Sequence, residues 1–222
     1  MGWSQEWNEL FQAGPQHRTV WPWSDLVSHV MRHTKGVTKG LRVLEVGCGA
    51  GANIPFFKSM GVEYFAIEGS EFIVQQLKDS NNDIRDHIVT GDFTEEIPFD
   101  GLFDLVVDRC SITHNTTRKI TNCLDMIHHR LVPGGKFIGI DWFSTEHTDY
   151  AKGEFDEDSF TKKNVYEGHL ANTGRIHFSD KIHLQELFHR FTLTAMEQKI
   201  VKREIPNDQF VFAAWNFVAQ KD

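Results

Sequence analysis

The stretch LRVLEVGCGAGANIPFF, residues 41–57, combines groups that can bind a ligand. An apolar run ends in three glycines, Gly47, Gly49 and Gly51, and the carboxylate of Glu45 stands two residues before the first of them. Glycines at the end of a strand let a ligand approach the backbone closely, and the helix that follows offers free N–H groups. The pattern therefore predicts a ligand site where a strand meets a helix.

Two kinds of ligand fit this loop. Gly47, Gly49 and Ala52 satisfy the dinucleotide pattern G-x-G-x-x-G/A, and Glu68 follows at roughly the 20-residue spacing of a ribose-binding acid. Glu45 favours a different ligand, because a carboxylate repels a pyrophosphate and attracts a cationic group. A ligand with an amino-acid ammonium beside a sulfonium would suit Glu45. A nicotinamide cofactor, which the glycine pattern allows, is the alternative.

The elements around the loop predict a parallel sheet. Strand-like and helix-like segments alternate over residues 41–140, which is typical of a doubly wound sheet with helices on both faces. Two helices, 3–13 and 24–33, are expected before it, the second capped by Ser24. The expected strands are 41–46, 62–67, 87–89, 102–108, 136–140, 191–201 and 208–219. The expected helices within and after the sheet are 52–60, 70–80, 116–131 and 180–190. The last strand is apolar on both faces and is therefore expected inside the sheet.

VLEVGCGAG resembles the first motif of the class I S-adenosylmethionine-dependent methyltransferases. YFAIEGS, TGDF, FDLVVDRCS and LVPGGKFIGIDW then follow in the family's order. The resemblance is strong over residues 41–141 and weaker over 180–219. It does not extend to residues 142–178. It implies a seven-stranded, mostly parallel sheet whose last strand is antiparallel, with S-adenosylmethionine as cofactor and S-adenosylhomocysteine as product.

The resemblance also assigns residues to the cofactor. It implies that Glu68 binds the ribose hydroxyls, that Asp92 contacts the adenine amino group and that Phe93 lies beside the ring. The cofactor-binding residues expected from it are Glu45, Gly47, Cys48, Gly49, Gly51, Glu68, Gly69, Ser70, Asp92, Phe93, Asp108 and Arg109.

The end of the fourth strand faces the transferred methyl group in this family, so catalytic residues are expected there. The candidates are His114, Asp108 and Arg109. His114 is the expected general base, because a histidine titrates near neutral pH. The sequence DRCS lacks the prolines of the [N/D]-P-P-[F/Y] motif of enzymes that methylate nucleic-acid amines.

A single domain of four parts is expected: a helical cap at 1–40, a cofactor-binding core at 41–141, a lid-like insertion at 142–178 and a C-terminal helix with strands at 179–222. The cap and the insertion are rich in aromatic and basic side chains. The substrate-binding residues expected from them are His17, Arg18, Trp21, Trp142, Tyr150, Arg175 and His177.

The composition disfavours one class of partner. The net charge is −8 and no segment clusters Lys and Arg, which disfavours nucleic acid. Three cysteines without a C-x-x-C pair, no secretion signal and no membrane span predict a cytoplasmic protein. His29 and His33 share a helix face, but no third ligand follows them, so no metal is expected.

Together these features predict methyl transfer to an oxygen or nitrogen nucleophile of a small molecule by direct displacement. Three alternatives stay open at this stage: an NAD(P)-dependent oxidoreductase, a methyltransferase acting on a protein side chain, and a non-catalytic module that binds the cofactor.

Overall fold

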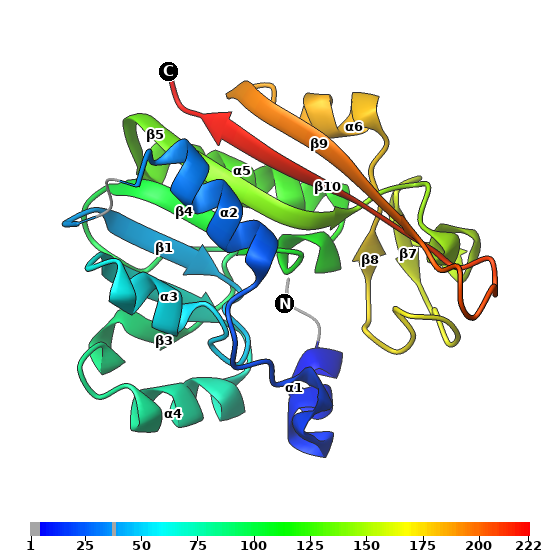
Figure 1. Cartoon of the computed structure of the whole chain (residues 1–222), viewed down its shortest axis with the longest axis horizontal. Coiled ribbons are helices and arrows are strands. Elements are labelled where there is room, and N and C mark those ends of the chain that lie inside the picture. Colours follow the sequence, from blue (N-terminus) through cyan, green and yellow to red (C-terminus); the bar gives the residue numbers. More distant parts are fainter. Residues whose placement is uncertain (1–4, 37–38) are drawn as a thin grey trace.

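A seven-stranded sheet organises the protein, shown by a computed structural model that describes residues 5–36 and 39–222. Its strand order is β3-β2-β1-β4-β5-β10-β9 (Figure 1). The strands are β1 (Arg42–Val46), β2 (Glu63–Glu68), β3 (Ile88–Thr90), β4 (Phe103–Arg109), β5 (Leu131–Phe143), β9 (Thr192–Lys202) and β10 (Val211–Gln220). Only β10 is antiparallel to its neighbours, and it lies inside the sheet as its apolar sequence predicts.

Helices cover both faces of the sheet. Figure 1 shows α2 (Ser24–His33) and α3 (Ile54–Ser59) in front of the strands and α5 (Thr117–Arg130) behind them. The front helices and α4 (Glu71–Ser80) contribute to one apolar core, whereas α5 and α6 (Lys181–Leu187) contribute to another. Helix α1 (Gln5–Ala13) packs beside α4. The predicted doubly wound fold, with helices on both faces, is confirmed.

Local differences from the predicted elements have simple causes. Ser70 caps α4 as expected, its hydroxyl accepting a hydrogen bond from the Ile73 N–H at 3.3 Å. Ser24 instead lies inside α2, which is preceded by Trp23 and has no side-chain cap. Strand β5 already starts at Leu131, because the segment containing Pro133 is a register irregularity within the strand rather than a separate turn. Predictions for Trp3, Val37 and Thr38 fall outside the described residues.

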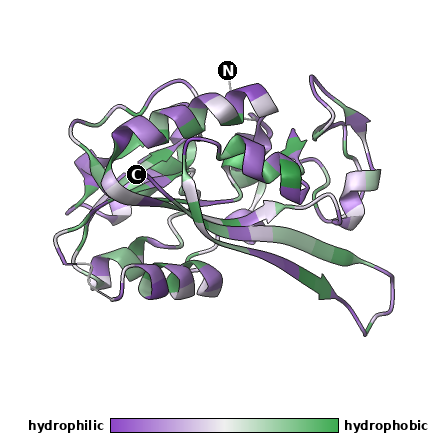
Figure 2. Cartoon of the chain, turned by 90° about the horizontal axis from the view of Figure 1, so that it is seen from above, coloured by the Kyte–Doolittle hydropathy of each residue, from purple (hydrophilic) through white to green (hydrophobic). Residues whose placement is uncertain are grey.

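The segment 142–178 is more regular than its sequence suggests. It holds the short turn η4 (Thr148–Ala151) and a three-stranded sheet of β6 (Glu154–Phe155), β7 (Thr161–Lys163) and β8 (Ile176–His177). A core of its own contains Phe143, Leu170 and Phe178. This insertion lies beside the long β9–β10 hairpin, which projects beyond the helices (Figures 1 and 2).

We expect the packing of α2 against the sheet to hold the N-terminal segment in place. Leu26 of α2 is completely buried, so Leu26→Ala should lower the free energy of unfolding by about 2–5 kcal/mol in urea titrations. The same substitution at Leu102, which is 43% exposed, should change it by less than about 0.5 kcal/mol. Equal effects of the two substitutions would contradict this packing.

Candidate active site

A cavity of about 530 Å³ lies at the carboxyl ends of β1, β2 and β4, the edge where ligands bind in doubly wound sheets. Glu45, Glu68 and Arg109 contribute to its wall from these three strands. The N-terminal segment covers it with Trp7, Phe11, Gln16, His17, Thr19 and Trp23. The insertion adds His169, Leu170 and Thr173, and β10 adds Phe212. The volume suits a small molecule or a cofactor.

The glycine loop of the cavity needs its glycines for two different reasons. Gly47 has φ +66°, and a Cβ there would collide with the side chain of Ser111. Gly51 has φ +79°, and its Cβ would lie 2.6 Å from Cδ2 of Leu77 in α4. Gly47 therefore lets the loop lie close to Ser111, whereas Gly51 lets the loop pack on a helix.

Two buried carboxylates face the cavity. Glu45 accepts hydrogen bonds from Asn53 Nδ2 at 2.7 Å and from Tyr64 Oη at 2.6 Å. Burial raises its pKa to about 7. Glu68 accepts from the N–H groups of Gly49 at 2.8 Å and Ser70 at 2.9 Å, and burial raises its pKa too. A ligand with a cationic group and hydroxyl donors would stabilise both carboxylates in their charged form.

The structure brings most of the predicted cofactor residues together. Those on the cavity wall are Glu45, Gly47, Cys48, Gly49, Glu68, Gly69, Phe93 and Arg109. Those outside it are Gly51, Ser70, Asp92 and Asp108. Ser70 is occupied as the cap of α4, and the Asp92 carboxylate accepts hydrogen bonds from the N–H and hydroxyl of Thr94 at 3.0 and 2.6 Å.

Asp108 requires a correction, because it is completely buried beneath the cavity. Its carboxylate accepts hydrogen bonds from Ser111, from the Ile112 N–H at 3.1 Å and from Trp142 Nε1 at 2.6 Å. Burial raises its pKa to about 6. Asp108 therefore shapes the turn η3 (Ile112–His114) rather than contacting a ligand.

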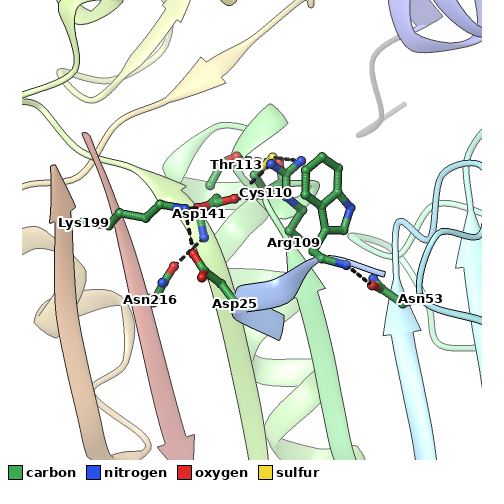
Figure 3. A network of polar contacts seen from close by, with 9 residues as sticks. Asp25, Asn53, Arg109, Cys110, Thr113, Asp141, Lys199 and Asn216 are labelled. Carbon is green, nitrogen blue, oxygen red and sulfur yellow. Dashed lines mark hydrogen bonds and ion pairs between the residues drawn. The ribbon is translucent and has the colours of Figure 1, made fainter. Parts of the chain in front are cut away.

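Arg109 lies on the wall, but its guanidinium is already engaged. Nε and Nη2 donate to Asp141 Oδ2 at 3.1 and 2.9 Å, and the guanidinium carbon lies 3.6 Å from the ring centroid of Trp23. Figure 3 shows this group in a network that continues to Lys199 and Asp25. The interactions of Arg109 fix the N-terminal segment over the sheet and leave its charge neutralised by Asp141.

His114 is the predicted catalytic residue that the structure places best. Its Nδ1 lies 2.7 Å from the carbonyl oxygen of Arg175. A carbonyl only accepts hydrogen bonds, so Nδ1 carries the proton and Nε2 the lone pair. Burial lowers the pKa of the ring to about 4, which keeps it neutral at physiological pH. His114 lies on the cavity wall beside Thr173, whose backbone also forms a hydrogen bond with the ring.

Of the predicted substrate residues, only His17 lies on the wall. Trp21 is 76% exposed, and Trp142 is completely buried against Asp108. His177 is buried and bonded to Thr161 and His183, while Arg175 pairs with Asp156. Arg18 donates to the carbonyl oxygen of Phe11, and Tyr150 packs on the core of the insertion.

Other wall residues were missed from the sequence. Trp7 and Phe11 belong to the apolar stripe of the first helix, so a signal existed, but it indicated packing only. His169, Thr173 and Phe212 reach the cavity from the insertion and from β10. Nothing local in their sequence marks them, because only the tertiary arrangement brings them there.

A second cavity of about 450 Å³ adjoins the first and shares Trp23, Arg109, His169 and Phe212 with it. Asp25, Asp141 and Lys199 line its other side. Over residues 5–36 and 39–222, no group of three or more His, Cys, Asp or Glu side chains is arranged to hold a metal ion.

Comparison with known proteins bears on the family. Residues 43–135, which carry the glycine loop and both carboxylates, match the methyltransferase domain family model. Residues 43–135 thus form a methyltransferase domain, and the seven-stranded order agrees with the class I fold that the sequence predicts. No curated protein sequence matches it.

Solved structures share the fold of this chain. A SAM-dependent methyltransferase from Methanosarcina mazei is 13% identical, with a TM-score of 0.67 over 86% of this chain and 96% of that one. The magnesium protoporphyrin IX methyltransferase of Synechocystis, solved with bound SAM, is 13% identical, with a TM-score of 0.57 over 89% and 78%. A Rhodobacter sphaeroides protein titled a putative Zn-dependent alcohol dehydrogenase is 18% identical, with a TM-score of 0.66 over 98% of both chains. At these identities the likeness shows the fold alone.

The predicted enzyme class and the predicted cofactor, S-adenosylmethionine, are thereby confirmed. The residues present fit that cofactor, because buried carboxylates and a glycine loop line one cavity. The nicotinamide alternative fits the sheet less well. The classic dinucleotide-binding order is 3-2-1-4-5-6, whereas here the antiparallel β10 lies between β5 and β9.

We expect cofactor affinity to depend on the charge of Glu45. Its pKa is about 7 in the free protein, and a bound ammonium favours the ionised form, so binding below pH 7 must release a proton. The dissociation constant for S-adenosylmethionine should therefore rise about tenfold as the pH falls from 8 to 6, measured by calorimetry.

Glu45→Gln should bind weakly and lose this component of the pH dependence. Glu63→Gln, at an exposed carboxylate on the neighbouring strand, should behave like the wild type. The same pH dependence in Glu45→Gln and the wild type would show that another group is responsible.

Proposed function

We propose that the protein transfers a methyl group from S-adenosylmethionine to an oxygen or nitrogen nucleophile of a small molecule. The observation that carries this proposal is the neutral His114, whose Nδ1 is held by the Arg175 carbonyl on the wall of a cavity that the N-terminal segment covers. A hydroxyl or amine nucleophile can donate its hydrogen to the Nε2 lone pair of this ring, so its own lone pair can be oriented for attack.

The residues of the wall divide into two groups with different tasks. Glu45 would hold the ammonium of the cofactor, and Glu68 would accept hydrogen bonds from its ribose hydroxyls. When bound, the cofactor supplies an electrophilic methyl group: the nucleophile bonds to the methyl carbon while the carbon–sulfur bond breaks, leaving its electron pair on sulfur in S-adenosylhomocysteine. Trp7 and Trp23 exclude water from this space.

A small molecule suits the site better than a protein side chain. The N-terminal segment and the insertion both contribute to the wall, so the cavity is bounded by chain beyond the sheet. A polypeptide substrate would need an open groove that accepts its backbone on either side of the reacting side chain. Methylation of a protein remains the contrary outcome of a substrate screen.

We further propose that the protein works in the cytoplasm. Cys48, Cys110 and Cys123 are all free, which supports a reducing compartment. No helix among the described residues is long and apolar enough to cross a membrane.

The test is a screen of hydroxyl, amine, thiol and carboxylate compounds with methyl-labelled cofactor, followed by kinetics of His114→Phe on the best acceptor. We expect kcat/KM to fall by about 10²–10⁴-fold if the lone pair orients and accepts the reacting proton. His189→Phe, an exposed histidine outside the cavity, should be unaffected. If His114→Phe leaves the rate of methyl transfer to oxygen or nitrogen unchanged, His114 does not orient the nucleophile or accept its proton. If methyl groups are transferred only to proteins, the acceptor is not a small molecule.

A further inference from the structure

The wall around His114 is aromatic. The ring of Trp7 meets the His114 ring edge-on, with centroids 5.0 Å apart, and the ring of Phe143 does so at 6.0 Å. Both rings belong to the same cavity, and Leu170 adds an apolar side chain from the insertion. The hydrogen-bond acceptor of the site is therefore surrounded by flat apolar surfaces, which favour a planar ligand in offset or edge-on contact.

The charges of the wall do not suit an anionic acceptor. Among the described residues that line the cavity, there is no lysine and a single arginine, Arg109. Its charge is already neutralised by Asp141. The two carboxylates, Glu45 and Glu68, are the negative groups, and both are assigned to the cofactor. A carboxylate or phosphate on the acceptor would thus be desolvated without a partner, which is costly.

His114 adds a second reason of a different kind. Because its Nδ1 donates to the Arg175 carbonyl, its Nε2 offers a lone pair. A lone pair attracts an O–H or N–H group and repels the oxygen of a carboxylate. Burial lowers the pKa of His114 to about 4, so the ring stays neutral at physiological pH. It therefore does not provide a positive charge that could bind an anion.

We propose that the methyl acceptor is an uncharged aromatic molecule whose reacting oxygen or nitrogen carries a hydrogen, as in a phenol or an aromatic amine. This inference rests on the proposed function, because it assumes that His114 faces the acceptor. It restricts the possible methyl acceptors to molecules that are uncharged, planar and able to donate a hydrogen bond.

The test compares matched probes by calorimetry in the presence of saturating S-adenosylhomocysteine, so that no transfer occurs. Phenol is paired with benzoate, and 2-naphthol with 2-naphthoate. In at least one pair, the hydroxyl compound should bind at least tenfold more tightly than its carboxylate. The absence of a tenfold preference for the hydroxyl compound in both pairs, or no binding by any of the four probes, would overturn the inference.

Failure of the proposed function gives a different result in the same experiment. A protein that does not bind S-adenosylhomocysteine at all would refute the cofactor site itself. A protein that binds S-adenosylhomocysteine but does not prefer the hydroxyl probes would refute only the acceptor class.

Two substitutions probe the physical cause. Gln16 is exposed and lies on the cavity wall, so Gln16→Lys should tighten 2-naphthoate binding at least fivefold by supplying an unpaired cation. Gln12→Lys adds the same charge at an exposed position of α1 outside the wall and should have no effect. Equal effects of the two lysines would show that the cavity does not select by charge.

His114→Phe keeps the aromatic wall and removes the lone pair. It should weaken 2-naphthol binding about tenfold, the value of one hydrogen bond to a buried acceptor, while S-adenosylhomocysteine still binds. Unchanged 2-naphthol affinity would show that His114 does not receive the hydroxyl group.

Discussion

The site depends on two carboxylates that are buried at the ends of adjacent parallel strands. Glu45 and Glu68 have only 2% and 7% of their surface exposed, and no lysine or arginine of the described residues forms an ion pair with either. Neutral donors hold them instead: an amide and a phenol for Glu45, and backbone N–H groups for Glu68. Burying a carboxylate without a cation is unfavourable, because the charged form loses its hydration. The pKa of each group is raised for this reason. The cavity is therefore built to receive positive charge, which a sulfonium cofactor with an ammonium group supplies.

The N-terminal segment that covers the cavity is linked to Glu45 through Asn53. Asn53 donates to Glu45 through Nδ2, and its Oδ1 accepts from the backbone N–H of Trp23 at 3.2 Å. Trp23 in turn stacks on Arg109, whose partner Asp141 joins Lys199 and Asp25 (Figure 3). One chain of contacts thus runs from the cofactor end of the cavity to the N-terminal segment and the outer hairpin. Arg109 is a link in this chain through Asp141 and Trp23, whereas its place at the end of β4 predicts a catalytic role.

Local sequence patterns predicted the sheet correctly, and most of the cofactor residues that they predicted lie on one cavity wall. Glu45, Glu68 and the glycines lie on contiguous strand–turn–helix units, where spacing along the chain fixes position in space. The acceptor end was predicted poorly, because its wall combines the first helix, the insertion and β10. Trp142 and His177 resemble surface-site residues in sequence, yet each has a buried hydrogen-bond partner that no pattern reveals. Asp108 failed for a related reason: a carboxylate at a strand end can face the ligand or support the turn below it, and only three-dimensional contacts decide.

The most direct test of this account is a calorimetric titration of the wild type and Glu68→Ala with S-adenosylmethionine, S-adenosylhomocysteine and NADH. Glu71→Ala, which removes an exposed carboxylate from the start of α4, is the matched control. The account predicts micromolar binding of both sulfur compounds by the wild type and the control, loss of that binding in Glu68→Ala, and no binding of NADH. Tight binding of NADH without a response to either sulfur compound would contradict it, and would show that the buried carboxylates serve a different ligand.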